Sequence, residues 1–381
     1  MKQGWKIKKL GDVVTFKSGY TPKDYELSGV GDVPYYKVSD MNHELNTKYL
    51  HHTSLFLKDG CKSFPKHSIV FPKNGAAIAT NKKRILTRES VVDLNTGIIC
   101  VSNPYTLNYE YLYLFIQNID FRLYTRRGAV PTLDSAELKS LPIPVPPIAE
   151  QEKIVAELDC LSGIIEKKKQ QLKELDNLAQ SIFYEMFGNP VENDKGWEVK
   201  KLEGIATSQI GITYKPENVS DDGVVVLRSS NIQDSTLAFN DIVRVNCPIK
   251  NAKYVKENDI LMCSRNGSFR LVGKVAMIPK LSEKMTYGAF MTIIRSDYQH
   301  YLFAFFKSPA FRTQLTTAQT ATINQITVKM LNEIQVALPP LSLQQEFASK
   351  IEAIERQKEL IKQSLSETET LFNSRMDYYF N

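Results

Sequence analysis

The stretch GWKIKKLGDVVTFKSGYTPKD, residues 4–24, returns as GWEVKKLEGIATSQIGITYKPEN at residues 196–218. Three later matches keep the same order: KVSDM at 37–41 with RSSNI at 228–232, the Asn-Gly pair at 74–75 with that at 266–267, and YLYLFIQNIDFR at 111–122 with YLFAFFKSPAFR at 301–312. Each copy covers roughly 185 residues, far more than the 20 to 50 residues of a solenoid repeat. The sequence therefore predicts two tandem copies of one large unit.

Each copy changes in composition at a proline cluster, LPIPVPP at 141–147 and ALPP at 337–340. Proline interrupts helices and central strands, so these clusters are predicted linkers. Before them, the runs DVVTF, SIVFP, GIICV, GVVVL, DILMC and MTIIR alternate with Gly, Asn and Pro, which is typical of short strands. The aromatic runs at 111–117 and 301–306 indicate a helix in each copy. We expect a mixed α/β globule before each linker.

After each linker comes a proline-free segment in which apolar residues recur every three or four positions. The positions are Ile154, Leu158, Leu161, Ile165, Lys168, Leu172, Leu175, Ala179, Ile182 and Met186 in the first copy, and Phe347, Ile351, Ile354, Lys358, Ile361, Leu365, Thr368, Phe372, Arg375 and Tyr379 in the second. A 3.5-residue seam over about five heptads indicates coiled-coil packing. Since neither stripe could stay exposed to water, we expect the two helices to pair antiparallel over about 50 Å.

The sequence thus predicts an α+β chain with pseudo-twofold symmetry, in which two tandem α/β globules are separated by two long helices packed as an antiparallel coiled coil. The globules span 1–143 and 189–337, and the helical segments span 144–188 and 338–381. Lys168 and Lys358 interrupt the apolar seams. They either fix the register of the pair, as polar seam residues do at some cost in stability, or extend to solvent.

Charge is divided unevenly along the chain, whose net charge is +6. Residues 1–140 carry 20 Lys and Arg against 13 Asp and Glu, and residues 188–334 carry 18 against 14. The helical segments are acidic: residues 141–187 carry 5 Lys and Arg against 8 Asp and Glu, and residues 335–381 carry 5 Lys and Arg against 7 Asp and Glu. Basic globules favour a long anionic ligand such as DNA, whereas the acidic helices are left for protein contacts.

Candidate DNA contacts fall in matching places in both copies. Arg and Lys can read guanine, Asn and Gln adenine, and Asp cytosine. In the first copy the candidates are Lys17, Tyr20, Lys23, Lys37, Ser39, Asp40, Asn42, Asn74, Lys82, Lys83, Arg84, Arg126 and Arg127. In the second copy they are Tyr214, Lys215, Arg228, Ser230, Asn231, Gln233, Arg265, Asn266, Ser268, Arg270, Gln319, Asn324 and Gln325. The framework repeats while these polar identities differ, as two readers of two different sequences would require.

Catalytic and cofactor motifs are incomplete. SNPYT at 102–106 resembles the [DN]PP[YF] loop of amino-methyltransferases but lacks the second proline, and GSFRLVGKV at 267–275 has five residues between its glycines and ends on valine where a phosphate loop needs Ser or Thr. The five cysteines are far apart without zinc spacing, and no apolar run approaches the ~18 residues of a membrane span. We expect a cytoplasmic protein without catalytic residues, metal or cofactor of its own.

Two globules that each lead through an LPxPPxxEQ pattern into a long helix resemble the DNA-specificity subunit of type I restriction-modification enzymes. LPIPVPPIAEQEKIV at 141–155 carries the pattern fully, whereas ALPPLSLQQEFA at 337–348 has Leu343 in place of the glutamate. We therefore expect a less secure start for the second helix. The SGYTP loop at 18–22 and the RNGS-x-x-LVGKV segment at 265–275 are also similar to recurring features of target recognition domains in that family.

The resemblance implies that each globule is a target recognition domain reading one half of a bipartite site in double-stranded DNA. It further implies that the helices set the spacing and dock two methyltransferase subunits, and that restriction/translocase subunits join outside. S-adenosylmethionine, ATP and magnesium would then be bound by those partners.

Two other classes stay open. A coiled-coil assembly adaptor would show no salt-dependent DNA binding in the assembled complex. A stand-alone methyltransferase or nuclease would bind its own cofactor, S-adenosylmethionine in the first case.

Overall fold

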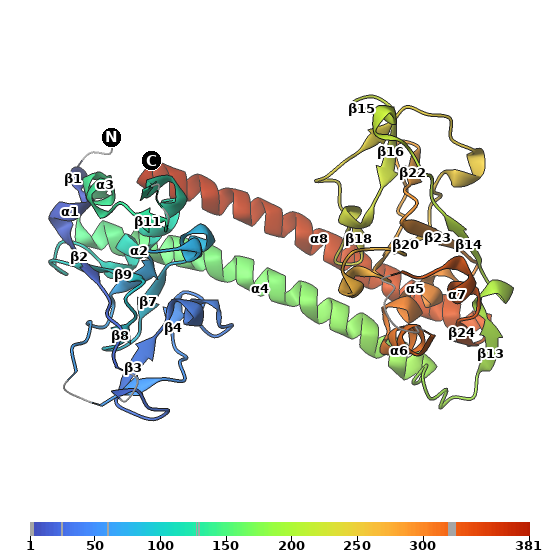
Figure 1. The fold of residues 1–381 in the computed structure, drawn as a ribbon, viewed down its shortest axis with the longest axis horizontal. Helices are drawn as coiled ribbons and strands as arrows, with labels where there is room; N and C mark the ends of the chain where they lie inside the picture. Colours follow the sequence, from blue (N-terminus) through green and yellow to red (C-terminus); the bar gives the residue numbers. More distant parts are fainter. Residues whose placement is uncertain (1–3, 24–25, 59–60, 127, 129, 319–324) are drawn as a thin grey trace. The chain divides into compact units, whose positions relative to one another are not determined.

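The computed structural model describes residues 4–381 apart from 24–25, 59–60, 127, 129 and 319–324. The chain forms two compact units: unit 1 comprises Met1–Lys169 and Gln363–Asn381, and unit 2 comprises Gln170–Lys362. Each unit therefore contains one globule together with part of both long helices, which are drawn in green and red in Figure 1. The packing units differ from the linear segments expected from composition, because each helix is shared between them.

Unit 1 is built on a five-stranded sheet of order β2-β9-β6-β7-β4 among the described residues. Its elements are β1 (Lys6–Lys9), α1 (Leu10–Val13), β2 (Val14–Ser18), β3 (Val33–Tyr36), β4 (Tyr49–Leu50), β5 (Phe56–Leu57), β6 (Ile69–Pro72), β7 (Arg84–Leu86), β8 (Val91–Val92), β9 (Thr96–Val101), α2 (Tyr109–Asn118), β10 (Thr125–Arg126), β11 (Thr132–Leu133), α3 (Ser135–Ser140), β12 (Pro142–Val145) and α4 (Ile148–Phe187). A second sheet has the order β5-β3-β8, and α2 covers the larger sheet.

Unit 2 repeats this plan with two four-stranded sheets of order β14-β23-β20-β21 and β15-β19-β16-β22. Its elements are β13 (Glu198–Lys201), β14 (Thr207–Ile210), β15 (Val219–Ser220), β16 (Val224–Leu227), β17 (Ile232–Gln233), β18 (Thr236–Leu237), β19 (Arg244–Val245), β20 (Ile260–Cys263), β21 (Val275–Met277), β22 (Met285–Tyr287), β23 (Met291–Arg295), α5 (Gln299–Lys307), α6 (Pro309–Ala318), α7 (Val328–Asn332), β24 (Gln335–Leu338) and α8 (Leu341–Phe380). The pairs β2/β9 and β6/β9 correspond to β14/β23 and β20/β23, all antiparallel.

The tandem repeat predicted from sequence is confirmed at the level of sheet topology. In both units the first strand pairs antiparallel with the strand that precedes the long helix, with Lys6 opposite Val145 and Glu198 opposite Leu338. All six predicted strand runs and both predicted aromatic helices are present. The proline clusters, predicted as linkers, instead contribute to β12 and β24 and the turns after them. Each strand belongs to a two-stranded sheet, so its edge position accommodates proline without losing a central ladder bond.

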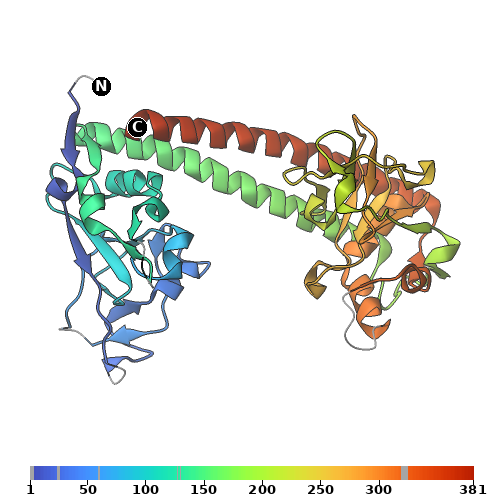
Figure 2. The same ribbon diagram turned by 45° about the horizontal axis from the view of Figure 1, so that its top comes forward.

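Within each unit α4 and α8 lie side by side and antiparallel (Figures 1 and 2). In unit 1, Glu157 binds Arg375 while Lys168 further along α4 binds Ser364, so residue numbers rise on one helix as they fall on the other. In unit 2, Asp176 binds Lys358. All twenty predicted seam residues are buried or half-buried. The seam was therefore placed correctly from its spacing.

Both seam lysines bind across the helix pair rather than extending freely to solvent. The ammonium of Lys168 donates to the carbonyl and hydroxyl of Ser364 at 2.8 and 2.7 Å and to Thr368 Oγ1 at 2.7 Å. Lys358 is 6% exposed and donates to Asp176 at 2.9 Å and Glu355 at 2.8 Å. Because such bonds require one relative position of the helices, they favour the register interpretation.

A buried glutamine ties the start of each long helix to its globule. Gln151 accepts from the Asn108 amide at 2.8 Å and donates to the carbonyls of Thr106 and Pro146. Its counterpart Gln344 donates to the Pro339 carbonyl at 2.7 Å. Both helices have 40 residues. The second helix forms without the glutamate that Leu343 replaces. Gln344 makes one bond where Gln151 makes three, and its Oε1 is buried without a partner among the described residues, so the weaker start stays a prediction.

Lys83 is a core residue, which corrects the prediction that it contacts DNA. Its side chain is fully buried, and its ammonium donates to Asn81 Oδ1 and the Ile119 carbonyl, both at 2.7 Å, 4.4 Å from the Phe121 ring centroid. The neighbouring Arg84 donates to the backbone carbonyls of Met41 and Asn46. Both cations stabilise loop backbone, so neither is free to bind a phosphate in this structure.

We predict that Phe347→Ala lowers the unfolding free energy of the full chain by about 3–5 kcal/mol, the usual cost of deleting a buried ring. Phe347 on α8 is 1% exposed and packs 5.0 Å from Phe187 of α4, measured between ring centroids. The measurement is chemical denaturation. The control Leu360→Ala removes a side chain on the same helix that is 68% exposed, and should change stability by less than about 0.5 kcal/mol. Equal losses from both variants would contradict the packing.

A second prediction concerns pH. Burial lowers the pKa of Lys83 to about 8, whereas the unfolded chain keeps the ordinary value near 10.5. Between these values the unfolded state binds more protons, so stability rises with pH. Relative to Lys83→Met, the wild type should gain about 2 kcal/mol of unfolding free energy from pH 7.5 to 9.5. If the pH profiles of the denaturation midpoints run parallel for the two proteins, folding does not lower the pKa of Lys83.

Candidate nucleic-acid interface

In the second globule, four chain segments meet where β14 and β20 end and β23 begins. We call this strand-end junction 2 and define it by Gly211, Arg265, Phe290 and Gln325. The amides of Ser264 and Arg265 both donate to the Phe290 carbonyl, at 2.9 and 3.1 Å. Arg265 also forms an antiparallel bridge with Gln325. Backbone bonds therefore connect the segments of the junction.

Strand-end junction 1 in the first globule has corresponding backbone connections, apart from the second amide on the turn carbonyl, and is defined by Gly19, Asn74, Asn95 and Thr132. The Lys73 amide donates to the Asn95 carbonyl at 2.8 Å, and Asn74 bridges to Thr132. The Lys73 ammonium donates to Ser18 Oγ at 2.7 Å, and burial lowers the pKa of this lysine. One backbone frame thus occurs twice with different side chains.

These bonds show that, at the junctions, the structural correspondence between the two copies is shifted by one residue from the sequence match. Lys73 and Ser264 each donate to the same turn position, Asn95 or Phe290, and each accepts from the residue after the bridge, Leu133 or Ile326. Asn74 is therefore the structural counterpart of Arg265. The matching Asn-Gly pairs at 74–75 and 266–267 made Asn266 look equivalent, although it lies one position further along.

A glycine is required at each junction because two backbones approach closely. A Cβ on Gly19 would lie 2.1 Å from the Asp93 carbonyl oxygen, and one on Gly211 would lie 2.2 Å from those of Tyr287 and Gly288. The Gly19 amide donates to the Thr96 carbonyl and the Gly211 amide to the Met291 carbonyl, both at 3.0 Å. Any larger residue would separate the loop after β2 or β14 from the turn beside it.

The side chains at the junctions suit base recognition. Arg265 is exposed and Phe290 is 58% exposed in junction 2, whereas Asn74 is half-buried and Asn95 exposed in junction 1. An arginine fork matches guanine O6 and N7, and an asparagine amide matches adenine N6 and N7. The two junctions therefore present different hydrogen-bonding groups on one backbone plan.

The matching segments KVSDM and RSSNI are mainly structural, which corrects the expectation for Asn231 and Asp40. Asn231 is 1% exposed, accepts from the Arg228 amide at 2.8 Å, and donates to the carbonyls of Ala238 and Asp241. Asp40 accepts from the Lys37 amide in the same way. These side chains hold tight turns together, so Asn231 is not placed to read adenine.

The remaining predicted residues are on or near the surface, and several already have protein partners. Lys17, Lys23, Lys37, Ser39, Asn42, Arg126, Lys215, Gln233, Ser268 and Arg270 are exposed, and Tyr20, Lys82, Tyr214, Arg228, Ser230, Asn266 and Gln325 are half-buried. Arg126 pairs with Asp134 and Arg228 with Asp241. A DNA contact by either arginine would have to compete with its carboxylate. Arg127, Gln319 and Asn324 lie outside the described residues.

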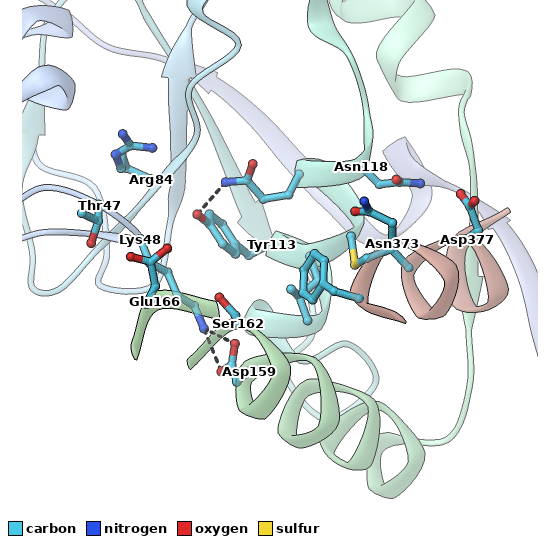
Figure 3. Close-up of a pocket in the computed structure, with 14 residues that line it drawn as sticks. Thr47, Lys48, Arg84, Tyr113, Asn118, Asp159, Ser162, Glu166, Asn373 and Asp377 are labelled. Carbon is cyan, nitrogen blue, oxygen red and sulfur yellow. Dashed lines mark hydrogen bonds and ion pairs between the residues drawn. The ribbon is translucent and has the colours of Figure 1, made fainter. Parts of the chain in front are cut away.

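A polar groove of about 740 Å³ lies in unit 1 where α2 meets both long helices (Figure 3). Lys48 reaches Asp159 of α4 at 2.8 Å on one side, and Gln117 donates to the Tyr113 hydroxyl. The groove is lined by Thr47, Lys48, Arg84, Tyr113, Leu114, Gln117, Asn118, Asp159, Ser162, Glu166, Phe372, Asn373, Met376 and Asp377. The groove lies on the acidic helices rather than at the strand-end junction.

Unit 2 has a smaller groove of about 350 Å³ at the repeat-equivalent place. Tyr113 and Gln117 of α2 are replaced by Phe303 and Lys307 of α5, and Met376 of α8 is replaced by Phe183 of α4. Burial lowers the pKa of Lys307. The two grooves therefore share a position but differ in chemistry.

Phe290 and Asn95 were missed by sequence analysis. Both lie in turns between two apolar runs, and such turns were assigned only as strand boundaries. An apolar residue in the turn GAF at 288–290 was the one available signal. Asp93 was also missed: its carboxylate accepts from the Val38 and Asn95 amides and the Thr96 hydroxyl, which fixes the turn of junction 1.

Within the described residues, no cluster of three or more His, Cys, Asp or Glu side chains could hold a metal ion. No helix in that same part of the chain has the length and apolar character needed to cross a membrane.

Comparison with known proteins places both copies in one family. The family model for the type I restriction modification DNA specificity domain matches residues 2–177 and 194–370. The EcoKI specificity subunit of Escherichia coli K12 is 27% identical over 169 residues, 42% of this chain and 36% of that protein. The MjaVIII specificity subunit of Methanocaldococcus jannaschii is 22% identical over 409 residues, covering 96% and 90%.

The matches to the first three curated relatives span only 36 to 52% of those proteins' length. Among solved structures, the S subunit of a type I restriction-modification system from M. genitalium has a TM-score of 0.58 with 14% identity, covering 99% of this chain and 96% of that one. This likeness supports the fold. Because the family model covers most of the sequence in two copies, the chain belongs to the type I restriction modification DNA specificity domain family.

Proposed function

We propose that this chain is the DNA-reading subunit of a type I restriction-modification complex, with each globule reading one half of a bipartite site. The observation that carries the proposal is the pair of strand-end junctions, which repeat one backbone frame with different side chains. A reader of two identical half-sites would need the same side chains twice. Different side chains on one frame suit an asymmetric site.

The charge distribution supports DNA as the ligand of the globules. Lys17 and Lys23 in the first globule and Arg270 in the second are exposed near the loops that form the junctions. Phosphate contacts by such cations release counterions, so affinity should fall steeply as salt rises.

We assign partner docking to α4 and α8, whose segments carry an excess of carboxylates. The groove beside α2 and its counterpart beside α5 would offer two places for methyltransferase subunits, with restriction subunits bound outside them. S-adenosylmethionine, ATP and magnesium would belong to those partners, and the complex would work in the cytoplasm. The relatives named above are specificity subunits, a class that recognises DNA rather than catalysing its modification.

We predict that the chain alone transfers no methyl group, whereas the chain assembled with its methyltransferase partner methylates adenines within a two-part DNA motif. Sequencing of modified adenines in plasmid libraries would show the motif, and the mass of the complex would give the number of partners. Replacing residues 1–143 by those of another family member should change one half of the motif. Methyl transfer by the purified chain, or an assembled complex without salt-dependent DNA binding, would contradict the proposal, and the second result would favour an assembly adaptor.

A further prediction treats the helix pair as the spacer of the motif. Seven residues inserted after Lys169 in α4 and after Lys362 in α8 restore the seam, because a heptad returns each residue to its face. Both insertion points lie between the contact of Lys168 with Ser364 in unit 1 and that of Lys358 with Asp176 in unit 2, so neither contact is interrupted. About 10 Å of added helix corresponds to up to about three base pairs.

The methylated motif should therefore keep both halves while its spacer grows by up to about three base pairs. A control with three residues inserted at each place breaks the seam and should destabilise the chain. A folded and active seven-residue variant with an unchanged spacer would show that the helices do not set the distance.

A further inference from the structure

Phe290 is a large apolar side chain at the strand-end junction of the second globule. It is 58% exposed and lies in the turn between β22 and β23. Its carbonyl accepts two amide bonds, and the Met291 amide donates to the Gly288 carbonyl at 2.9 Å to close the turn. The backbone below the ring is therefore fixed. A single exposed phenylalanine needs no explanation by itself, but this ring has a specific neighbour.

That neighbour is Arg265, whose guanidinium carbon lies 5.3 Å from the centroid of the Phe290 ring. Three other arginines of this globule are bound to carboxylates: Arg228 to Asp241, Arg244 to Glu283 and Arg295 to Asp259. Within the described residues, the Arg265 side chain contacts the aromatic ring and forms no ion pair. Its guanidinium N–H groups bind no other described residue, so within that part of the chain they stay available to a ligand.

A ring stacked on guanidinium restricts where the fork points without using any of its hydrogen bonds. Arginine otherwise loses much rotamer freedom on binding, so stacking in advance lowers that cost. The backbone of Arg265 is held from both sides, by the Phe290 carbonyl and by the bridge to Gln325. The fork is thus prepared for one planar partner with two acceptors, which in the DNA major groove is guanine.

The first globule shows that this pairing is not imposed by the frame. At the equivalent positions Asn74 approaches Asn95, with 3.5 Å between the amide nitrogen and oxygen, and no cation stacks there. Both positions therefore differ between the globules: two amide side chains in the first are replaced by a cation over an aromatic ring in the second. Such a change suits a change of the base that is read rather than a change of fold.

We propose that Phe290 is a positioning residue that holds Arg265 to read one guanine in the half-site of the second globule. This rests on the proposed function, because it requires that the globules read DNA.

The test uses the assembled methylating complex and a plasmid library with both half-sites randomised. Arg265→Ala should reduce discrimination at one guanine by about 5- to 150-fold, the value of a bidentate base contact. Phe290→Leu should reduce it at the same position by about 2- to 5-fold, whereas Phe290→Tyr, which keeps an aromatic face, should retain it. Arg88→Ala is the matched control, because it removes an exposed arginine that lies over another aromatic ring, Phe56, in the first globule, and it should change no position.

The design separates three failures. If the wild-type complex shows no bipartite motif, the proposed function is wrong and this inference falls with it. If the motif is present but Phe290→Leu matches the wild type, or weakens all positions equally, Phe290 does not position a reader. If Arg265→Ala relaxes a position that is not guanine, the assigned base is wrong. Thermal unfolding of each variant verifies folding, and retained recognition by Phe290→Tyr distinguishes stacking from mere bulk.

Discussion

Each globule completes its core with a helix end from the other repeat, and the rest of the structure depends on this exchange. The core of unit 1 contains Met376, Tyr379 and Phe380 of α8, and that of unit 2 contains Phe183 and Phe187 of α4. Tyr111 packs 5.2 Å from Phe380, and its counterpart Tyr301 packs 4.9 Å from Phe187, between ring centroids. Neither repeat can bury its apolar surface alone, so duplication in one chain is a packing requirement.

The exchange also explains why the helices must keep one register. The seam is polar at a few positions, where Glu157 binds Arg375 in unit 1 and Asp176 binds Lys358 in unit 2. A slip by one turn would break both pairs, and the cost would be largest at Lys358, whose side chain is 8% exposed, because the partly solvated Asp176 and the Glu157–Arg375 pair are screened by water. Apolar residues supply the stability and the charged pairs select the alignment.

Periodicity and repetition predicted most of the fold but little of the interface. The seam of α4 and α8 followed from spacing because helical packing is periodic. The junctions could not be predicted this way, since they join Gly211, Arg265, Phe290 and Gln325 across more than a hundred residues through backbone bonds that leave no side-chain signature. For the same reason Lys83 and Asn231 looked like surface contacts: their polarity is visible in sequence, whereas their buried partners are carbonyl groups and amides supplied by folding.

In a junction held by backbone bonds, the glycine positions must stay glycine, whereas the side chains at the bridge positions can change. Gly19 and Gly211 cannot accept a Cβ, because carbonyl oxygens lie about 2 Å from where it would be. Asn74 and Arg265 each form an antiparallel bridge, to Thr132 and Gln325, while their side chains differ completely. Substitution at these positions leaves the connecting bonds intact, so the cost to stability is small and the effect falls on whatever the edge contacts. A scaffold of this kind can exchange one recognised base for another without rebuilding its core, provided that the glycine beside the turn is kept.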